Sequence, residues 1–439
     1  MFLIGKDSEL TMMELGKIIN QFQTKELIDL NKYYNYYKGK QKITDKRPTD
    51  EGKPCNQVCV NYCYNIVQNY LGYLTGIDVT YSSDKDFEDI QEVLNYNDVH
   101  NTDSELLRNA LIYGVSYEIN YVDEDGAQRF KVLDSREVIP VYDNTLNQNL
   151  VYAIRFYRND MINSDEYIVE VYDSTTCRKY KSSNGFSSFS LLEEIPHYFA
   201  QVPITVFSLN AEEDSIFDKI MTLQDAYNEL LSDEVDDFQS FADAYLVMKG
   251  VYAKPEELND AKKKRAFMID PDADISYLTK NMNDTQIQDM LKNVNDAIHK
   301  IANSPDFNDE KLMAQSGIAM RYKLIGFENA ASAIEANMKK ALQKRIELIC
   351  EIINLKSDEA LWRDVNIQFT RNLPSNLLET TQIVNSLRGL VSDETLLSLL
   401  PFVNDPAAEL EKLNAQKEAN MSLYNFSSGN TEEEEDADE

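Results

Sequence analysis

The feature that most constrains the fold of this chain is a long run, residues 213–243, that is predicted to form one helix. Large apolar residues recur at every third or fourth position from Ile216 to Tyr245, and neither proline nor glycine interrupts them. At the α-helical rise per residue this helix is about 45 Å long, with one apolar stripe that needs a partner. The residues predicted to pack along this stripe include Ile216, Ile220, Leu223, Tyr227, Phe238 and Phe241. The other faces are mainly acidic, with Asp218, Asp225, Glu229, Asp233, Glu234, Asp236, Asp237 and Asp243.

A second amphipathic helix is predicted at 284–303. Its apolar face carries Ile287, Leu291, Val294 and Ile298. Between the two helices, residues 244–283 contain two extended segments and a basic cluster, Lys262, Lys263, Lys264 and Arg265. Adjacent cations create a local field that a distant acidic excess cancels only in part. Two interpretations of this cluster stay open: the solvated edge of a loop, or a surface that docks a partner or lies near DNA.

The remaining segments mix helical and strand patterns, so the predicted fold class is α+β. Helices are expected at 8–38, 58–74 and 86–113, and the alternation on both sides of DEDG predicts a β-hairpin. Further strands are expected at 150–158, 167–172 and 201–207. A long alanine-rich helix is predicted from Ser316 to about Leu355, then a strand at 365–373 and short helices beyond Pro374. The final TEEEEDADE is typical of a disordered acidic tail.

The charge balance limits how this chain can meet nucleic acid. Lys and Arg number 43 against 75 Asp and Glu, which gives a formal net charge of −32. A protein that binds duplex DNA by neutralising phosphates needs the opposite balance. Any contact with DNA is therefore expected to be loose. No apolar run approaches the roughly 20 residues of a membrane span, and MFLIGKDSEL does not resemble a signal peptide, so no membrane association is expected.

The motifs of catalysis and metal binding are not found in this sequence. It lacks the glycine-rich phosphate loops, and YVDEDGAQRFKV fails as a calcium loop because Tyr121 and Val132 stand where carboxylates are required. Cys55, Cys59 and Cys63 recur at helical spacing with no nearby histidine, which is not a zinc pattern. We therefore expect no enzyme activity, no metal and no cofactor.

A series of segments, in this order along the chain, is similar to the portal proteins of tailed bacteriophages, most of all those of long-tailed phages of Gram-positive hosts. The similarity runs from about residue 30 to 415 and depends on the whole series. The segments are YYKGKQKI, VNYCYNIVQNYLGYLTGIDVTY, the Tyr117–Asp134 hairpin, SGIAMRYKLIGFENAAS, IQFTRNLPSNLLE and VSDETLLSLLPFVNDPAAELE. Residues 173–200 and the acidic tail follow no pattern of this family.

The resemblance implies a dodecameric ring at one vertex of the capsid, assembled in the host cytoplasm and retained in the virion. Double-stranded DNA would pass through its channel without sequence-specific binding during packaging and ejection. The implied partners are the large subunit of the terminase, a head–tail adaptor, and the major capsid and scaffolding proteins. An acidic helical scaffold protein of the virion that never contacts DNA is the alternative, and it would form a dimer, trimer or fibre instead of a closed ring.

The resemblance also implies a portal-protein fold with named parts. These are an α+β wing at 1–212, stem helices at 213–243 and 284–303, a small α/β clip at 244–283, a tunnel loop at 304–315, a long wing helix and strand at 316–373, a helical crown at 374–430 and a tail at 431–439. The tunnel-loop residues expected nearest DNA are Asn308, Asp309, Glu310, Lys311, Leu312, Met313 and Gln315. Because packaged DNA is duplex and offers no splayed bases, the tyrosines of NKYYNYYKGKQKI are expected to pack within the wing instead of stacking on bases.

Overall fold

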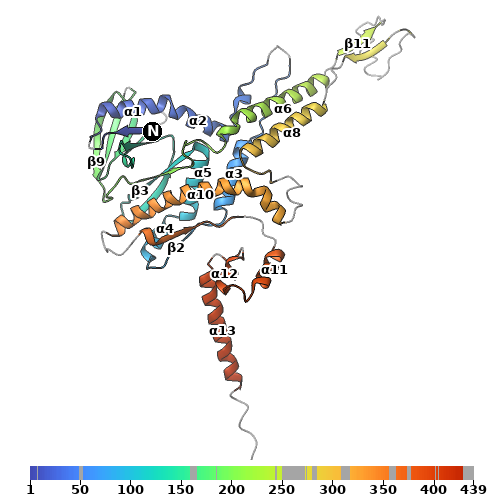
Figure 1. Cartoon of the computed structure of the whole chain (residues 1–439). Helices are drawn as coiled ribbons and strands as arrows, with labels where there is room; N and C mark the ends of the chain where they lie inside the picture. The colour runs from blue at the N-terminus through green and yellow to red at the C-terminus, as the bar shows by residue number, and fades with distance from the viewer. Residues whose placement is uncertain are drawn as a thin grey trace, which may run out of the picture.

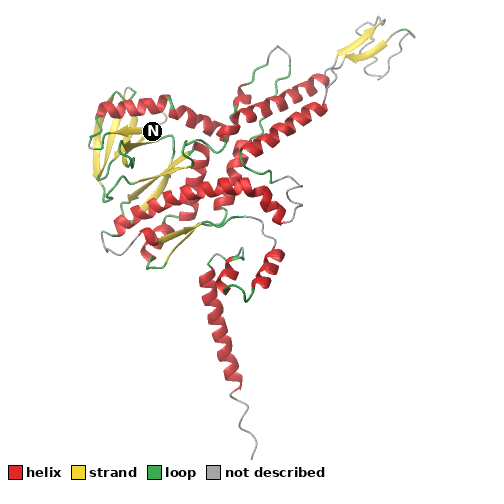
Figure 2. Cartoon of the chain, viewed as in Figure 1, coloured by secondary structure: helices red, strands yellow, loops and turns green. Residues whose placement is uncertain are grey.

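Helices and strands both contribute strongly to this chain, and the α+β class predicted from the sequence is confirmed. The computed structural model describes residues 1–6, 8–48, 53–158, 166–183, 185–242, 245–249, 272, 274–278, 284–307, 317–354, 362–372, 377–400, 402–403 and 405–428. Most strands gather in one body, and a separate strand pair lies at the far end of two projecting helices (Figure 2). The two projecting helices therefore extend away from the main core.

Two sheets form the framework of the body. The larger has the strand order β1-β5-β6-β7-β8-β9 and is antiparallel except for the parallel β1–β5 pair. Its strands are β1 (Phe2–Ile4), β5 (Val138–Asp143), β6 (Leu150–Arg158), β7 (Tyr167–Tyr172), β8 (Thr176–Ser183) and β9 (Ser188–Pro196). The smaller is antiparallel, with β3 (Val115–Val122) between β10 (Ile204–Ser208) and β4 (Gln128–Leu133). A short pair, β2 (Thr80–Ser83) and β13 (Val365–Gln368), lies beside them.

Helices cover these sheets and join them to the rest of the chain. The longest, α10 (Gly317–Ile353), crosses the body and packs on β10 and β3 (Figure 1). The N-terminal helices are α1 (Met12–Thr24), α2 (Glu26–Tyr37), α3 (Tyr62–Thr75), α4 (Glu88–Tyr96) and α5 (Val99–Tyr113). Helices α6 (Met221–Ala242) and α8 (Asp284–Ile301) project side by side toward β11 (Tyr245–Lys249) and β12 (Asp274–Leu278). On another side follow α11 (Leu377–Leu387), α12 (Asp393–Ser398) and α13 (Pro406–Ser428).

Several helix boundaries differ from the sequence-based expectation because side chains bond to the local backbone. The predicted helix at 8–38 is divided at Lys25, after the Thr24 hydroxyl donates hydrogen bonds to the carbonyl oxygens of Asn20 and Gln21. The predicted helix at 213–243 begins only at Met221, preceded by a 3-10 turn at Asp218–Ile220. Before that turn, Glu213 adopts a φ of 58°. Asn210 and Asp214 also bond to each other through side chain and backbone there, so local side-chain bonding accompanies both boundaries.

A fully buried ionic cluster lies where α10 crosses the smaller sheet. Arg345 of α10 is 0% exposed and donates hydrogen bonds of 2.8 and 2.6 Å to the carboxylate of Glu118 on β3. The same guanidinium is paired with Asp103 of α5, whose carboxylate accepts a hydrogen bond from the hydroxyl of Tyr81. The ring of Phe130 lies under the guanidinium at 4.6 Å. These contacts fix α10 to the sheet through charge as well as through apolar packing.

Candidate functional site

The projecting pair α6 and α8 is held together by a short apolar contact near the body. Ile220 and Ile298 are 0% exposed, and Leu291 is buried as well. The other predicted packing residues on this stripe are half-buried: Ile216, Leu223, Tyr227, Ile287 and Val294. Phe238, farther along α6, is 67% exposed, and nothing is described of the Phe241 side chain. Within a single chain, the stripe is therefore buried at its base and open toward its end.

A second face of α6 is buried although it is polar. Gln224, Asn228 and Ser232 are each 0% exposed, and Asp236 continues the same spacing. We call these residues the α6 ladder, because each bonds to the backbone of the extended segment 56–62. In each bond a backbone amide donates to a side-chain oxygen of α6. The amide of Tyr62 donates to Gln224 Oε1 (3.0 Å) and that of Val60 to Asn228 Oδ1 (2.9 Å). The amide of Val58 donates to Ser232 Oγ (3.0 Å) and that of Asn56 to Asp236 Oδ1 (2.7 Å).

The geometry of the two elements explains why the bonds repeat so regularly. A step of four residues along an α-helix advances about 6.0 Å, and a step of two residues along an extended chain advances about 6.6 Å. Alternate amides of segment 56–62 therefore meet successive turns of α6. The ladder was not predicted from the sequence, although polar residues at every fourth position beside the apolar stripe are a visible signal of it. It also explains why the helix predicted at 58–74 begins at Tyr62.

The carboxylates of α6 and of the turn before it, which make the helix mainly acidic outside its apolar stripe, are bonded largely within the chain itself. Asp218 accepts a hydrogen bond of 2.9 Å from the hydroxyl of Tyr33, and Asp225 accepts one of 2.9 Å from Tyr36. Asp233 and Asp236 pair with Lys46 at 2.8 and 2.9 Å. Burial, and then the bonded carboxylate, raises the pKa of both tyrosines, so they remain neutral donors.

The tyrosine-rich stretch therefore packs within the chain, as predicted. Besides the two bonds to carboxylates, Tyr34 stacks on Tyr113 with 6.2 Å between ring centroids. Tyr37 contacts Tyr64 at 5.4 Å. Aromatic pairs of this kind add to the stabilisation that burial provides. The stretch joins the end of α2 to α5 and α6.

Replacing Tyr36 by phenylalanine tests one of these bonds. The variant keeps the ring but leaves the Asp225 carboxylate without its donor, so we expect the free energy of unfolding to fall by about 1.5 kcal/mol. Urea denaturation followed by circular dichroism measures it. Tyr64→Phe is the matched control, because the Tyr64 side chain is 47% exposed. Equal losses in the two variants would show that the hydroxyl bond to Asp225 contributes nothing.

The predicted tunnel-loop residues Asn308–Gln315 and the basic cluster Lys262–Arg265 lie outside the described residues. The chain is described on both sides of the tunnel-loop stretch, up to Phe307 and again from Gly317 at the start of α10, and α3 contacts both of these flanks. The hydroxyl of Tyr70 donates a hydrogen bond of 3.0 Å to the carbonyl oxygen of Ala302, and Asn69 donates one of 2.9 Å to Ser304 Oγ. On the other flank, the rings of Tyr70 and Tyr73 each lie 4.6 Å from that of Phe327.

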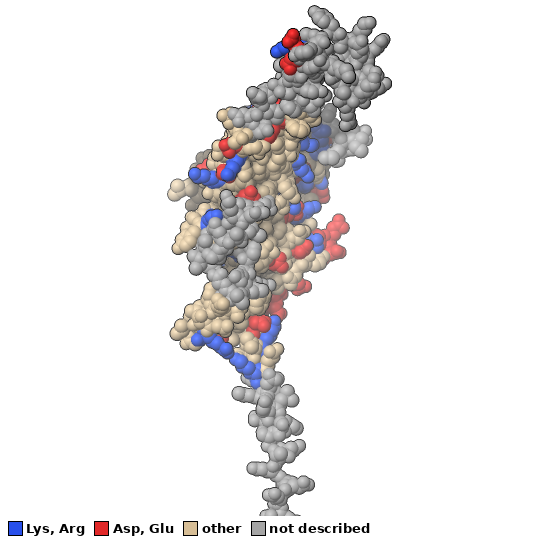
Figure 3. Space-filling view, turned by 90° about the vertical axis from the view of Figure 1, so that its right-hand side faces the viewer, with Lys and Arg blue, Asp and Glu red and all other residues tan. Residues whose placement is uncertain are grey.

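Charge is mixed over the side of the molecule that faces the viewer in Figure 3. Acidic and basic side chains alternate there in small groups on the coloured part of the surface, without one continuous acidic area. This agrees with the internal pairing of the α6 carboxylates. The net charge of −32 is therefore a poor guide to the character of the coloured part of this face.

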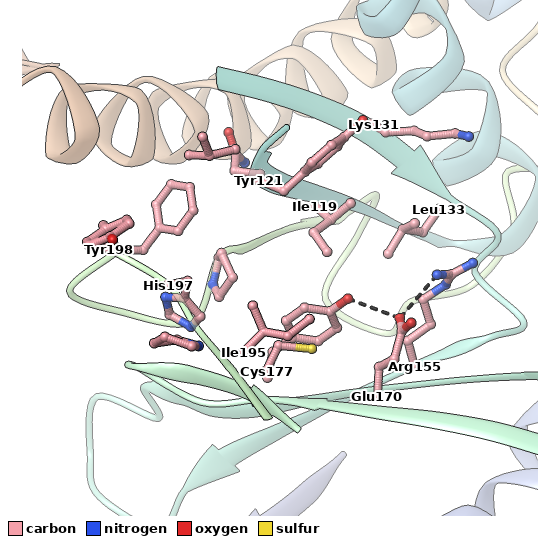
Figure 4. Close-up of a pocket in the computed structure, with 16 residues that line it drawn as sticks. Ile119, Tyr121, Lys131, Leu133, Arg155, Glu170, Cys177, Ile195, His197 and Tyr198 are labelled. Atoms are coloured by element: carbon pink, nitrogen blue, oxygen red, sulfur yellow. Dashed lines mark hydrogen bonds and ion pairs between the residues drawn. The ribbon is translucent and has the colours of Figure 1, made fainter. Parts of the chain in front are cut away.

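A cavity of about 580 Å³ opens between the two sheets of the body (Figure 4). Among its charged groups, Glu170 accepts hydrogen bonds from Arg155 at 3.2 Å and from Tyr172 at 3.0 Å. Burial, with Glu170 nearby, raises the pKa of the Cys177 thiol to about 12, which makes it a poor nucleophile at neutral pH. Among the described residues, those lining the cavity include none of the predicted site residues. The cavity gives no support to an active site.

The comparison with protein families distinguishes between the two functional hypotheses from the sequence, a portal protein and an acidic scaffold protein. A family model described as "Phage portal protein, SPP1 Gp6-like" matches residues 16–423. The chain belongs to this family of phage portal proteins. The resemblance seen in the sequence is thereby confirmed, and portal function is favoured over that of an acidic scaffold protein.

Individual relatives agree with the family match. The portal protein of Bacillus phage SPP1 is 24% identical over 471 aligned positions, which cover 98% of this chain and 92% of that protein. The portal protein of Clostridium phage phiCD119 is 22% identical over 300 positions, 65% of each chain. Both phages infect Gram-positive hosts, as the sequence suggested. None of the helices in the described part of this portal protein combines the length and apolar composition needed to cross a bilayer.

Proposed function

We propose that this portal protein assembles into a closed, dodecameric ring at one capsid vertex and that duplex DNA passes through the channel during packaging and ejection. The observation that carries the proposal is the family match, which spans nearly the whole chain, from residue 16 to 423. The projecting pair α6–α8 supports it, since paired helices at one end of a subunit are suited to surround an axis. The ring remains in the virion.

The parts of the subunit then have distinct tasks. The wing, 1–212, packs at the periphery with α10 and β13, and α6 and α8 form the stem. Residues 244–283, with β11 and β12, form the clip, where Lys262–Arg265 meet the large terminase subunit during packaging and a head–tail adaptor later. The crown at 374–430 includes α11, α12 and α13 and lies inside the head. The major capsid and scaffolding proteins contact the outer surface.

The segment 304–315 approaches DNA most closely in this proposal. Residues Asn308–Gln315 mix both signs of charge with Leu312 and Met313. Such a mixture gives soft contacts to a moving duplex, and few fixed cations mean few displaced counterions and weak retention. The channel can then pass DNA in both directions without gripping it.

Cross-linking tests the assignment of this segment. A photoreactive amino acid at Met313 is expected to cross-link to DNA in filled particles, whereas the same group at Leu146, a fully exposed wing residue, is not. Negative-stain images of the purified protein should show discs with a central hole. Cross-links from the wing position alone would overturn the channel assignment, and images without a hole would overturn the ring.

A further inference from the structure

Helix α3 contacts the stem at its beginning and the tunnel-segment flanks at its end. Its first residue, Tyr62, is also the last residue of the segment 56–62 bound by the α6 ladder, and its amide makes the last bond of the ladder, to Gln224. The Tyr62 ring lies edge-on to Tyr227 of α6 at 5.2 Å and to His299 of α8 at 5.6 Å. The start of α3 is therefore fixed against both stem helices.

The hydrogen bonds at the start of α3 leave little freedom for α6 to move independently of α3. The Asn228 amide donates a hydrogen bond of 2.6 Å to Gln41 Oε1 while its oxygen accepts the bond from Val60. Asn61, just before α3, accepts a hydrogen bond of 3.0 Å from Gln41 Nε2 and one of 3.1 Å from the amide of Tyr64. An extended chain held at alternate amides cannot stretch, so a displacement of α6 pulls on α3.

The far end of α3 holds both flanks of the tunnel segment at once. Tyr70 bonds to Ala302, just before the segment, and Asn69 bonds to Ser304, its first residue. After it, Phe327 lies against Tyr70 and Tyr73, and the hydroxyl of Tyr73 bonds to Glu328. Helix α8 reaches the first flank directly through the chain, whereas α3 contacts both. A change at the second flank, and not one at the first, therefore distinguishes coupling through α3 from coupling through α8.

We propose that α3 is a coupling helix that transfers displacements of stem helix α6, through the α6 ladder, to the two flanks of the tunnel segment. The proposal rests on the proposed function only in assigning DNA contact to that segment. A helix of 14 residues is about 21 Å long and stiff, so it can carry a displacement between its ends. The ladder residues Gln224, Asn228 and Ser232 are then positioning residues for the channel.

Hydrogen exchange on the purified full-length protein tests the coupling. In Asn228→Leu, which removes the bonds to Val60 and Gln41 on the face away from the apolar stripe, we expect amide exchange at 56–62 to rise at least tenfold. Exchange at 324–328 should rise as well, although the ladder does not touch those residues. Ser232→Val should act in the same way, while Ser232→Thr, which retains a hydroxyl, and Glu229→Gln, on an exposed face, should resemble the wild type. A rise confined to 56–62 would overturn the proposal.

A variant near the C-terminal end of α3 tests the coupling even if the ladder variants do not fold. Tyr70→Phe removes only the hydroxyl that bonds to Ala302, and reciprocal coupling predicts faster exchange at 58–62 as well as at 302–304. No change at 58–62 would count against the coupling. These measurements need no DNA, so a failure of the Met313 cross-link would count against the assignment of the tunnel segment to the channel and leave the coupling result intact.

Discussion

Replacing Arg345 by methionine is expected to lower the free energy of unfolding by about 3–5 kcal/mol, which is the usual cost of removing one partner from a buried ion pair. The guanidinium is 0% exposed and compensates two buried carboxylates, Glu118 and Asp103, so the variant leaves both in an apolar setting without their cation. Thermal and urea unfolding, followed by circular dichroism, measure the loss.

The control for this prediction restores neutrality. Adding Glu118→Gln and Asp103→Asn to Arg345→Met removes the uncompensated charge, so the triple variant should regain much of the loss. If the triple variant is less stable than the single one, the bonds within the cluster matter more than its charge.

The loss of stability in the single variant Arg345→Met is predicted to depend on pH. Burial raises the pKa of Glu118 above its ordinary value of 4.5, and Arg345 opposes that rise. A group with a raised pKa in the folded state contributes stability that is present at low pH and is lost as the pH rises through the folded pKa. Removing Arg345 raises this pKa further, so the deficit relative to wild type should shrink as the pH falls from 8 toward about 5. A deficit that grows on acidification would contradict this assignment.

Replacing Phe238 by aspartate is expected to abolish ring assembly while leaving the wing folded. The Phe238 side chain is 67% exposed in the single subunit, at the open end of the apolar stripe. A large apolar side chain contributes about 1.5–3 kcal/mol when buried, and a ring repeats that contact at every interface. An aspartate would forfeit it and would bury a charge.

Size-exclusion chromatography with light scattering measures the result. The aspartate variant should elute as single subunits or small oligomers with the circular dichroism of the wild type. Phe238→Leu is the matched control, since it retains an apolar side chain and should still form rings. Intact rings of Phe238→Asp would show that this end of α6 does not take part in the subunit interface.

Much of the fold followed from periodicity, and the exceptions have physical causes. The expected β6 and β7 agree with the structure, and α8 and α10 agree to within a few residues, because alternation and amphipathic spacing run undisturbed there. The start of α6 was wrong because Asn210 and Asp214 bond to each other through side chain and backbone, which no periodicity reveals. Within residues 173–200, which matched no family pattern, the structure describes the antiparallel strands β8 and β9.

The candidate site was harder to derive from the sequence than the fold. The sequence shows that α6 is mainly acidic outside its apolar stripe, but it does not show the partners of these carboxylates, because Tyr33, Tyr36 and Lys46 lie far away in the sequence. The ladder was not predicted for a similar reason. Its hydrogen-bond donors are backbone amides of residues 56–62, and the sequence does not show which backbone amides bond to which side chains. The packing role of the tyrosines was recovered, whereas the assignments of the tunnel and clip residues stay predictions.

The ladder also limits what can reach α6 from outside. One flank of the helix is occupied by its own chain and another by α8, which leaves a narrow outward strip along the first turns. Thr222, Glu229 and Asp233 are exposed on it. The electrostatic character of this strip is therefore set by a few positions, of which Asp233 is already paired with Lys46, and not by the total charge of the subunit.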